Sequence, residues 1–268
     1  MKKLIVPIKY FGGKSNIKNE ILKYFPEKET YNTYCEVFGG TYSLGLALEN
    51  PPPIEIYNDL DKNVYSLYKV LSDIDMFKNF KEKCDLIFYN EDLRKEFKDL
   101  LKTDNLSLID RAFYFFYINR TSFNGTGGFS MNTHIRRNMS KSISDFLSTI
   151  DRLPELHNRL SRVIVSNTDG VQLIRRYNDP KVLIYCDPPY EQSKRTGARY
   201  DVDMNRAKQI EFLDAVIESK SKIIISGYTC ELYQRLVENG FEQIEFDVKT
   251  ITRHMKPKTK IETLWKNF

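Results

Sequence analysis

An apolar run at residues 181–186 constrains the fold more than any other part of the sequence, because two prolines follow it almost at once. The run is typical of a buried central strand. Proline fixes its own φ and disfavours helix for the preceding residue, so this strand is predicted to end in a stiff turn. Open α/β sheets bind ligands at such strand ends. The residues of the turn are Asp187, Pro188, Pro189 and Tyr190.

The chemistry of this turn suits a flat base that carries an amino group. The Asp187 carboxylate and the Pro188 carbonyl, held in fixed directions, can accept both hydrogens of such an amine. The Tyr190 ring can stack on the base. Methylation of the exocyclic amine of a nucleobase would require an arrangement of this kind.

Strand and helix patterns alternate along the 268 residues and predict an α/β fold. Helical periodicity marks residues 62–160, which contain a polar loop rich in Gly and Asn at 119–132. We therefore expect a catalytic domain of residues 1–61 and 161–268 with a helical insertion at 62–160. Strands are predicted at 34–38, 54–57, 163–165, 182–186 and 222–226, a short helix at 43–48, and a hairpin at 244–251 and 261–265.

The composition limits the setting and the cofactors. The four cysteines are scattered without a CxxC pair, which argues against a structural zinc and for a reducing, cytoplasmic location. The three histidines are too dispersed to suggest a metal site. No apolar run is long enough for a membrane span, and no signal peptide is expected. The net charge of +5 is compatible with binding to nucleic acid.

Two further segments lie where a ligand could bind. Gly39 and Gly40 come between a predicted strand and a predicted helix, where they either let a ligand approach the backbone or simply make the turn. Asp59 follows the next strand, where it either accepts both hydroxyls of a ribose or caps the helix that begins near Lys62. Asp61 is close enough to be mistaken for it, and we select Asp59 for the ribose.

The sequence contains no GxGxxG motif, so a nucleoside without phosphates suits this chain better than a dinucleotide does. S-adenosylmethionine is such a nucleoside, and its sulfonium suits a site near the carboxylates of Glu36 and Asp187. At the N-terminus, Tyr10 and Lys14 flank a glycine pair that lacks the spacing of a phosphate-binding P-loop.

Five motifs of this chain, in order, resemble those of the Dam-like, D12 class N6-adenine DNA methyltransferases. They are the N-terminal cofactor motif at 9–14, the first five positions (36–40) of the cofactor loop usually written EPFxGxG, the ribose-binding turn Asn58-Asp59, the NRxxxNG recognition loop at 119–125 and the catalytic DPPY at 187–190. Val37 replaces the proline of the cofactor loop, and Thr41 follows its second glycine. Ser226-Gly227-Tyr228, with Tyr233 downstream, is similar to the phage-type members.

The resemblance implies a Rossmann-like methyltransferase sheet with an inserted helical DNA-recognition subdomain. It also implies direct methyl transfer from S-adenosylmethionine to the N6 amine of a flipped-out adenine in double-stranded DNA, with S-adenosylhomocysteine as the product and no metal. The implied cofactor-binding residues are Tyr10, Lys14, Glu36, Phe38, Gly39, Gly40, Asp59, Asp169 and Asp187. Gly170, beside Asp169, is often Phe in relatives.

DNA contacts are expected in the recognition loop and in the basic residues around it. The predicted DNA-binding residues are Lys14, Asn119, Arg120, Asn124, Arg136, Arg137 and Arg195. In GATC-specific relatives an arginine closely follows the Asn-Gly pair, whereas residues 126–128 of this chain are Thr-Gly-Gly. An arginine that reads guanine is therefore missing at that place, and no target sequence is predicted.

The leading interpretation is a monomeric, site-specific DNA adenine methyltransferase of the cytoplasm, bacterial or phage-encoded and associated with the nucleoid through DNA. It acts either as an orphan enzyme, in phage protection, or beside a cognate restriction endonuclease. Two alternatives stay open: an enzyme of the same fold with another acceptor, which is RNA adenine, cytosine N4 or a glutamine amide, and a catalytically inactive DNA-binding module. The presence of Asp187 and Tyr190 argues against the inactive module.

Overall fold

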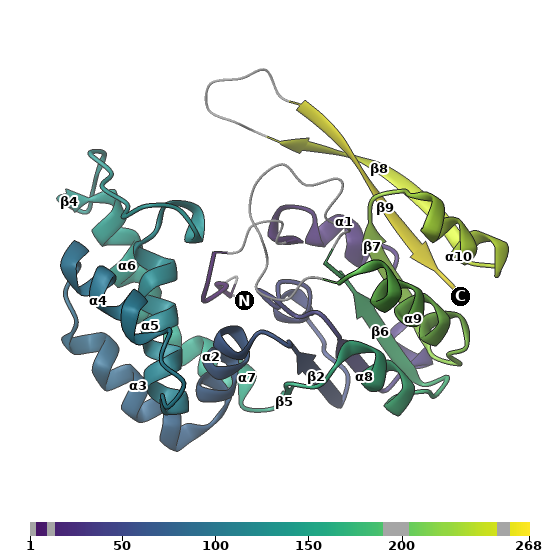
Figure 1. Ribbon diagram of the computed structural model, residues 1–268, viewed down its shortest axis with the longest axis horizontal. Coiled ribbons are helices and arrows are strands. Elements are labelled where there is room, and N and C mark those ends of the chain that lie inside the picture. Colours follow the sequence, from purple (N-terminus) through teal and green to yellow (C-terminus); the bar gives the residue numbers. More distant parts are fainter. Residues whose placement is uncertain (1–3, 10–13, 190–203, 251–257) are drawn as a thin grey trace. The chain divides into compact units, whose positions relative to one another are not determined.

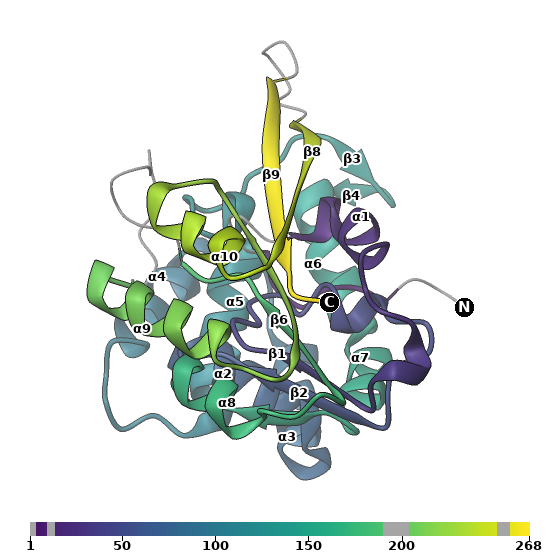
Figure 2. The same cartoon turned by 90° about the vertical axis from the view of Figure 1, so that its right-hand side faces the viewer.

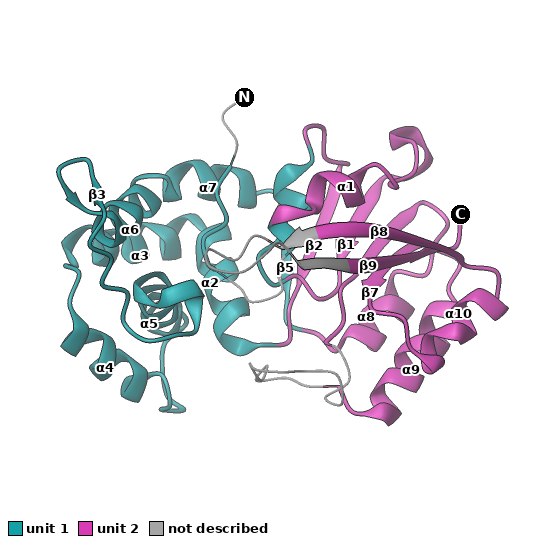
Figure 3. Cartoon of the chain, turned by 90° about the horizontal axis from the view of Figure 1, so that it is seen from above, with its two compact units in different colours: residues 1–15, 40–48, 61–167 teal, residues 16–39, 49–60, 168–268 magenta. Residues whose placement is uncertain are grey.

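The computed structural model describes residues 4–9, 14–189, 204–250 and 258–268, and it divides into two compact units (Figure 3). Unit 1 comprises residues 1–15, 40–48 and 61–167, and unit 2 comprises residues 16–39, 49–60 and 168–268. Unit 1 contains all of the predicted insertion at 62–160. It also takes in residues 1–15 and 40–48, which the predicted boundaries assign to the catalytic domain.

The described strands of unit 2 form one sheet in the order β2-β1-β6-β7-β9-β8 (Figure 1). The parallel strands are β2 (Ile54–Asn58), β1 (Thr33–Glu36), β6 (Val182–Cys186) and β7 (Lys222–Gly227). β9 (Lys258–Lys266) pairs antiparallel with β7 and with β8 (Glu242–Thr250). The predicted central strand, the strands beside it and the terminal hairpin are thereby confirmed.

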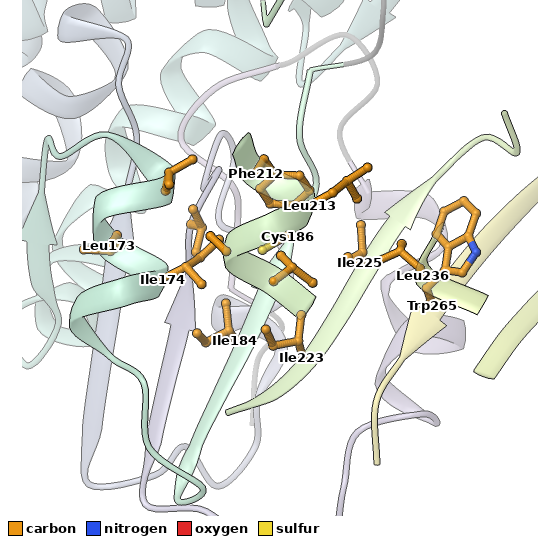
Figure 4. Packing of buried hydrophobic residues seen from close by; sticks show 14 of the residues in the cluster. Leu173, Ile174, Ile184, Cys186, Phe212, Leu213, Ile223, Ile225, Leu236 and Trp265 are labelled. Carbon is orange, nitrogen blue, oxygen red and sulfur yellow. The ribbon is translucent and has the colours of Figure 1, made fainter. Parts of the chain in front are cut away.

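Helices cover both faces of this sheet (Figure 2). α8 (Gly170–Arg176), α9 (Arg206–Ile217) and α10 (Gln234–Glu238) lie on one face, and α1 (Lys18–Leu22) lies on the other. The core of the first face joins α8, α9 and α10 to alternate residues of the strands, among them Ile184, Cys186, Ile223 and Ile225 (Figure 4). Because side chains alternate along a strand, Tyr185 and Asp187 point to the α1 side of the sheet.

The strand order creates a switch point between β1 and β6. The chain runs from β1 to β2 on one side, whereas it runs from β6 to β7 on the opposite side. Ligands of open α/β sheets bind beyond the carboxyl ends of the strands at such a reversal. The fold therefore favours a binding site beyond Glu36 and Cys186, the last residues of these two strands.

Unit 1 is mainly helical, and four of its helices begin at side chains that cap them. In each of these helices, backbone N–H groups of the first turn donate to the side chain of the cap, which is Asp61, Asp73, Asn90 or Ser107. The helices are α2 (Lys62–Ser72), α3 (Ile74–Leu86), α4 (Glu91–Leu100), α5 (Leu108–Thr121), α6 (Lys141–Asp151) and α7 (Leu153–Leu160). Phe80, Phe116 and Phe146, which are almost fully buried, help to form its aromatic interior.

Short elements complete the two units. The two-residue strands β3 (Ile135–Arg136) and β4 (Met139–Ser140) form a hairpin, and β5 (Ile164–Ser166) confirms the strand predicted at 163–165. The helix predicted at 43–48 is only a 3-10 turn, η3 (Gly45–Ala47). Among the described residues, further 3-10 turns are η1 (Lys14–Asn16), η2 (Lys28–Thr30), η4 (Phe123–Gly125) and η6 (Glu231–Tyr233).

Candidate active site

Parallel pairing brings three predicted carboxylates to the carboxyl edge of the unit 2 sheet. Glu36 is level with Tyr57 of β2 and with Tyr185 of β6. Asp59 directly follows β2, and Asp187 directly follows β6. Glu36, Asp59 and Asp187 therefore extend from three adjacent strands around the switch point.

Glu36 is held by the strand that carries it. Its side chain is almost fully buried, and the Tyr34 hydroxyl donates a hydrogen bond of 3.0 Å to its Oε2. Residues two apart on a strand share a face, so the tyrosine is placed to reach this carboxylate. A buried carboxylate needs such partners, because burial without them disfavours its charged form.

The turn after β1 is shaped by its neighbours in the fold. The Gly39 N–H donates to the Asn58 carbonyl over 2.7 Å. A Cβ at Gly39 would lie 2.2 Å from the Tyr57 ring, so the packing of this ring requires glycine. A Cβ at Gly170 would likewise lie 2.9 Å from both Phe38 and Val37. Packing alone therefore requires glycine at position 39, whether or not a ligand binds there.

Asn58 ties this turn to the segment before Asp169, a role that the sequence did not reveal. Its Nδ2 donates to the carbonyls of Val37 and Thr168, each over 2.9 Å, and its Oδ1 accepts from the Thr168 N–H over 2.8 Å. Asn58 is almost fully buried. A polar residue at the end of an apolar strand is the signal that could have pointed to it.

The structure separates Asp59 from Asp61. The Asp61 side chain caps α2, because its Oδ1 accepts from Asn63 N over 2.7 Å and from Val64 N over 3.3 Å. The helix-cap interpretation of Asp59 is therefore wrong. Asp59 lies at the strand end, where a carboxylate can meet a ribose.

Asp169 is the N-cap of α8 and has a cation beside it. Its Oδ1 accepts from Val171 N over 3.0 Å and from Gln172 N over 3.3 Å. Its Oδ2 lies 3.3 Å from Lys208 Nζ of α9. The side chain thus has a structural role, in addition to its position in the loop that Asn58 holds.

Asp187 has a partner that the sequence motif did not include among the site residues. The Ser226 hydroxyl of β7 donates to Asp187 Oδ1 over 3.1 Å. Pro188 is buried, and the Pro189 carbonyl accepts from Gln209 Nε2 over 3.5 Å. Tyr190 of the predicted catalytic set lies outside the described residues, as do Tyr10 and Arg195.

Unit 1 holds the other predicted residues. Lys14 is buried in η1, and Gly40 has a positive φ of 46°. Asn119 is almost fully buried in the last turn of α5, where its Oδ1 accepts from Lys9 N over 2.8 Å and its Nδ2 donates to Lys9 O over 2.7 Å. Gly125, with φ at 86°, completes this contact, because a Cβ there would lie 2.3 Å from Lys9 O.

Arg120 is also part of the fold of unit 1. Its guanidinium donates to Thr149 Oγ1 and to the Asp145 carbonyl. Burial lowers the pKa of Arg120 to about 10, against the opposing effect of Asp145. Asn119 and Arg120 therefore hold the base of the recognition loop, and their contact with DNA stays a prediction.

The tip of the recognition loop and the β3–β4 hairpin are exposed. Asn124 is exposed with a positive φ of 51°, and Arg136 and Arg137 are exposed in the hairpin. Arg136 and Lys141 both pair with Asp145. Beneath the loop, almost fully buried Arg94 donates to Ser122 Oγ over 2.9 Å and to the Gly127 carbonyl over 2.6 Å. The loop thus presents polar and basic side chains from a fixed base.

Within the described ranges, no group of three His, Cys, Asp or Glu residues could hold a metal ion. No helix in the part of the chain described here has both the length and the apolar character needed to cross a membrane.

A family model for the D12 class N6 adenine-specific DNA methyltransferases matches residues 10–254. The chain therefore belongs to this family, and its sheet with a helical segment is a methyltransferase-like α/β fold. The match includes the cofactor loop, Asp59, the recognition loop and the turn at Asp187.

Individual proteins show more distant similarity. The chain is 24% identical to the type II methyltransferase M.FokI of Planomicrobium okeanokoites over 269 residues, which is 93% of this chain and 39% of that protein. It is 23% identical to the DNA adenine methylase of Haemophilus influenzae, over 96% of this chain and 91% of that protein. The chain thus spans about two fifths of M.FokI. The solved structure of PH1948 from Pyrococcus horikoshii, assigned as an RNA methyltransferase, aligns with a TM-score of 0.42 and 12% identity over 99% of this chain and 90% of that one.

Proposed function

We propose that this protein transfers a methyl group from S-adenosylmethionine to the N6 amine of adenine in double-stranded DNA. The observation that carries the proposal is the position of Asp187, which directly follows the central strand β6 at the switch point of the sheet. The chain that forms this sheet belongs to the D12 class. Unit 2 would carry the chemistry, and the helical insertion in unit 1 would recognise the DNA.

The residues of unit 2 fit S-adenosylmethionine. Glu36, Asp59 and Asp187 give the edge of the sheet a negative character that suits a sulfonium cation, and the partly exposed Phe38 ring suits an adenine. Glu36, Phe38, Gly39, Asp59 and Asp169 would hold the cofactor. When bound, it supplies an electrophilic methyl group and becomes S-adenosylhomocysteine, with the electron pair of the broken C–S bond kept on sulfur.

Asp187 and the Pro188 carbonyl would bind the acceptor amine. Adenine N6 is a weak nucleophile because its lone pair is conjugated with the ring. Two acceptors for its hydrogens would turn the nitrogen toward sp³ geometry, so that the lone pair can form the new N–C bond, and the surplus proton would leave to solvent. Positioning and local electrostatics then supply the acceleration. The base must leave the duplex first, at a cost of a few kcal/mol.

Exposed side chains of unit 1 would contact the DNA. Asn124 at the loop tip suits base or backbone contact, and Arg136 and Arg137 suit phosphates.

We further propose that the protein acts as a cytoplasmic monomer of phage type, either alone or beside a restriction endonuclease. The similarity to a type II methyltransferase supports the latter role.

Substitution of Asp187 tests this function. Wild type and Asp187→Ala are incubated with radiolabelled S-adenosylmethionine and unmethylated genomic DNA or total RNA. We expect label on DNA with wild type and none with the variant, whose urea unfolding midpoint should stay close to that of wild type. Substantial methylation by Asp187→Ala would refute the role of this carboxylate, and label on RNA alone would favour the RNA methyltransferase.

A further inference from the structure

Two hydroxyl groups connect to Asp187 within unit 2. The Tyr185 hydroxyl and Ser226 Oγ lie 2.7 Å apart, and Ser226 Oγ donates to Asp187 Oδ1 over 3.1 Å. Tyr185 and Ser226 are 1% and 0% exposed, so both hydroxyls are screened from water. A buried hydroxyl is costly unless it is hydrogen-bonded, and these two satisfy each other.

The direction of this hydrogen-bond chain follows from the number of hydrogens. An ionised carboxylate only accepts, so the single hydroxyl hydrogen of Ser226 is committed to Asp187. The hydrogen between Tyr185 and Ser226 must then come from Tyr185. The chain runs from Tyr185 through Ser226 to Asp187, and successive hydrogen bonds in one direction polarise each other.

Strand pairing explains why these three residues meet. In the parallel pair β6–β7, Tyr185 is level with Ile224 and Cys186 is level with Ile225, so the pairing continued by one residue sets Asp187 beside Ser226. Tyr185 and Asp187 are two residues apart on one strand and therefore share a face. The contact is thus built into the central sheet, which is more rigid than a loop.

We propose that Ser226, oriented by Tyr185, is a positioning residue that fixes the Asp187 carboxylate for the N6 amine. This inference rests on the proposed function of Asp187. A carboxylate at a strand end can rotate about its side-chain bonds, and a hydrogen bond to one oxygen selects one orientation. Misplacement of a reacting group by about 1 Å can cost about 100-fold in rate, so one hydrogen bond can control the chemical step.

The test measures single-turnover methyl transfer, with enzyme in excess over unmethylated genomic DNA, for five variants. Ser226→Ala should lower the rate roughly 10- to 100-fold and leave KM for S-adenosylmethionine and for DNA near the wild-type values. Ser226→Cys, which is slightly larger and keeps only a weak S–H donor, should fall between Ser226→Ala and wild type. Tyr185→Phe should lower the rate by less than Ser226→Ala does.

The double variant separates positioning from a general structural effect. Because Tyr185 acts through Ser226, Tyr185→Phe combined with Ser226→Ala should be no slower than Ser226→Ala alone. Ser221→Ala is the matched control. Ser221 is an equally buried serine just before β7 that accepts from Asp179 N and donates to the Tyr177 carbonyl. Its removal should change the unfolding midpoint but not the rate.

Several outcomes would overturn the proposal. They are a wild-type rate in Ser226→Ala, additive losses in the double variant, or an equal loss of rate in Ser221→Ala. If wild type methylates DNA and Asp187→Ala does not, such a result refutes only the role of Ser226. If wild type methylates nothing, the proposed function fails, and the inference about Ser226 fails with it.

Discussion

Asn58 and Thr168 form a reciprocal pair of hydrogen bonds, with Asn58 Nδ2 donating to the Thr168 carbonyl over 2.9 Å and the Thr168 N–H donating to Asn58 Oδ1 over 2.8 Å. The same Nδ2 donates to the Val37 carbonyl. One buried amide therefore joins the end of β2, the turn after β1 and the segment that leads into α8. The family resemblance implies that the cofactor binds beside these three segments.

Replacement of Asn58 should destabilise this junction. Asn58→Ala leaves buried carbonyls and an N–H group without their partner, and we expect a loss of about 2–3 kcal/mol in the free energy of unfolding. Urea denaturation measures it. Asn239→Ala is the control, because exposed Asn239 donates to the Arg235 carbonyl on the surface of the same unit and should cost less than about 0.5 kcal/mol. Equal losses in the two variants would contradict the assigned role of Asn58.

We predict that the loss of stability caused by Gly39→Ala depends on the Tyr57 ring. Gly39→Ala places a Cβ 2.2 Å from this ring, so it should destabilise the protein by about 1–3 kcal/mol. Substitution of Tyr57 by Leu should remove most of the additional loss that Gly39→Ala causes. Unfolding midpoints of the two single variants and the double variant give the coupling. An additive result would mean that Gly39 is required for a reason other than this ring.

Asp59 and Asp61 should give separable effects. Asp61→Ala removes the cap of α2 and should lower stability by about 1 kcal/mol, whereas Asp61→Asn retains a capping side chain and should be nearly neutral. Neither should change the affinity for S-adenosylmethionine in calorimetry. Asp59→Ala should weaken that affinity. If Asp61→Ala weakened it instead, the choice of Asp59 for the ribose would be wrong.

We predict that the Asp145 carboxylate stabilises the fold to an extent that depends on pH. Burial acts to raise its pKa, but hydrogen bonds and charges of Lys141 and Arg136 outweigh it and hold the pKa of Asp145 below its ordinary value. A carboxyl group of this kind adds stability above its unfolded pKa and loses it as the pH falls through the folded pKa. Asp145→Asn should therefore cost about 0.5–1 kcal/mol near pH 6, and the difference should shrink below about pH 4. Urea denaturation at several pH values measures it, and a constant difference from pH 6 to pH 3 would be inconsistent with this pairing.

Much of the unit 2 sheet could be predicted from the sequence, because its strands are short apolar runs, each of which ends at a turn or at a proline. For this reason the bounds that the sequence predicts for β6 are the observed ones. The prediction of a helix at 43–48 failed: a single 3-10 turn forms there, and the Tyr42 ring packs directly on Gly45. Apolar periodicity does not reveal that kind of steric contact.

The sequence could not reveal contacts between distant segments. Ser226 meets Asp187 only because β7 pairs with β6, and Arg94 reaches Gly127 only because α4 packs beneath the recognition loop. Asp59 and Asp61 are equally plausible caps by sequence spacing alone. The backbone geometry at the start of α2 decides between them.

The identity of the methylated nucleoside tests the central claim most directly. Unmethylated duplex DNA is incubated with the protein and isotopically labelled S-adenosylmethionine, digested to nucleosides and separated by liquid chromatography with mass spectrometry. We predict that the label appears in N6-methyladenine for wild type and disappears with Asp187→Ala. Label in N4-methylcytosine, or no labelled nucleoside from DNA, would contradict the account.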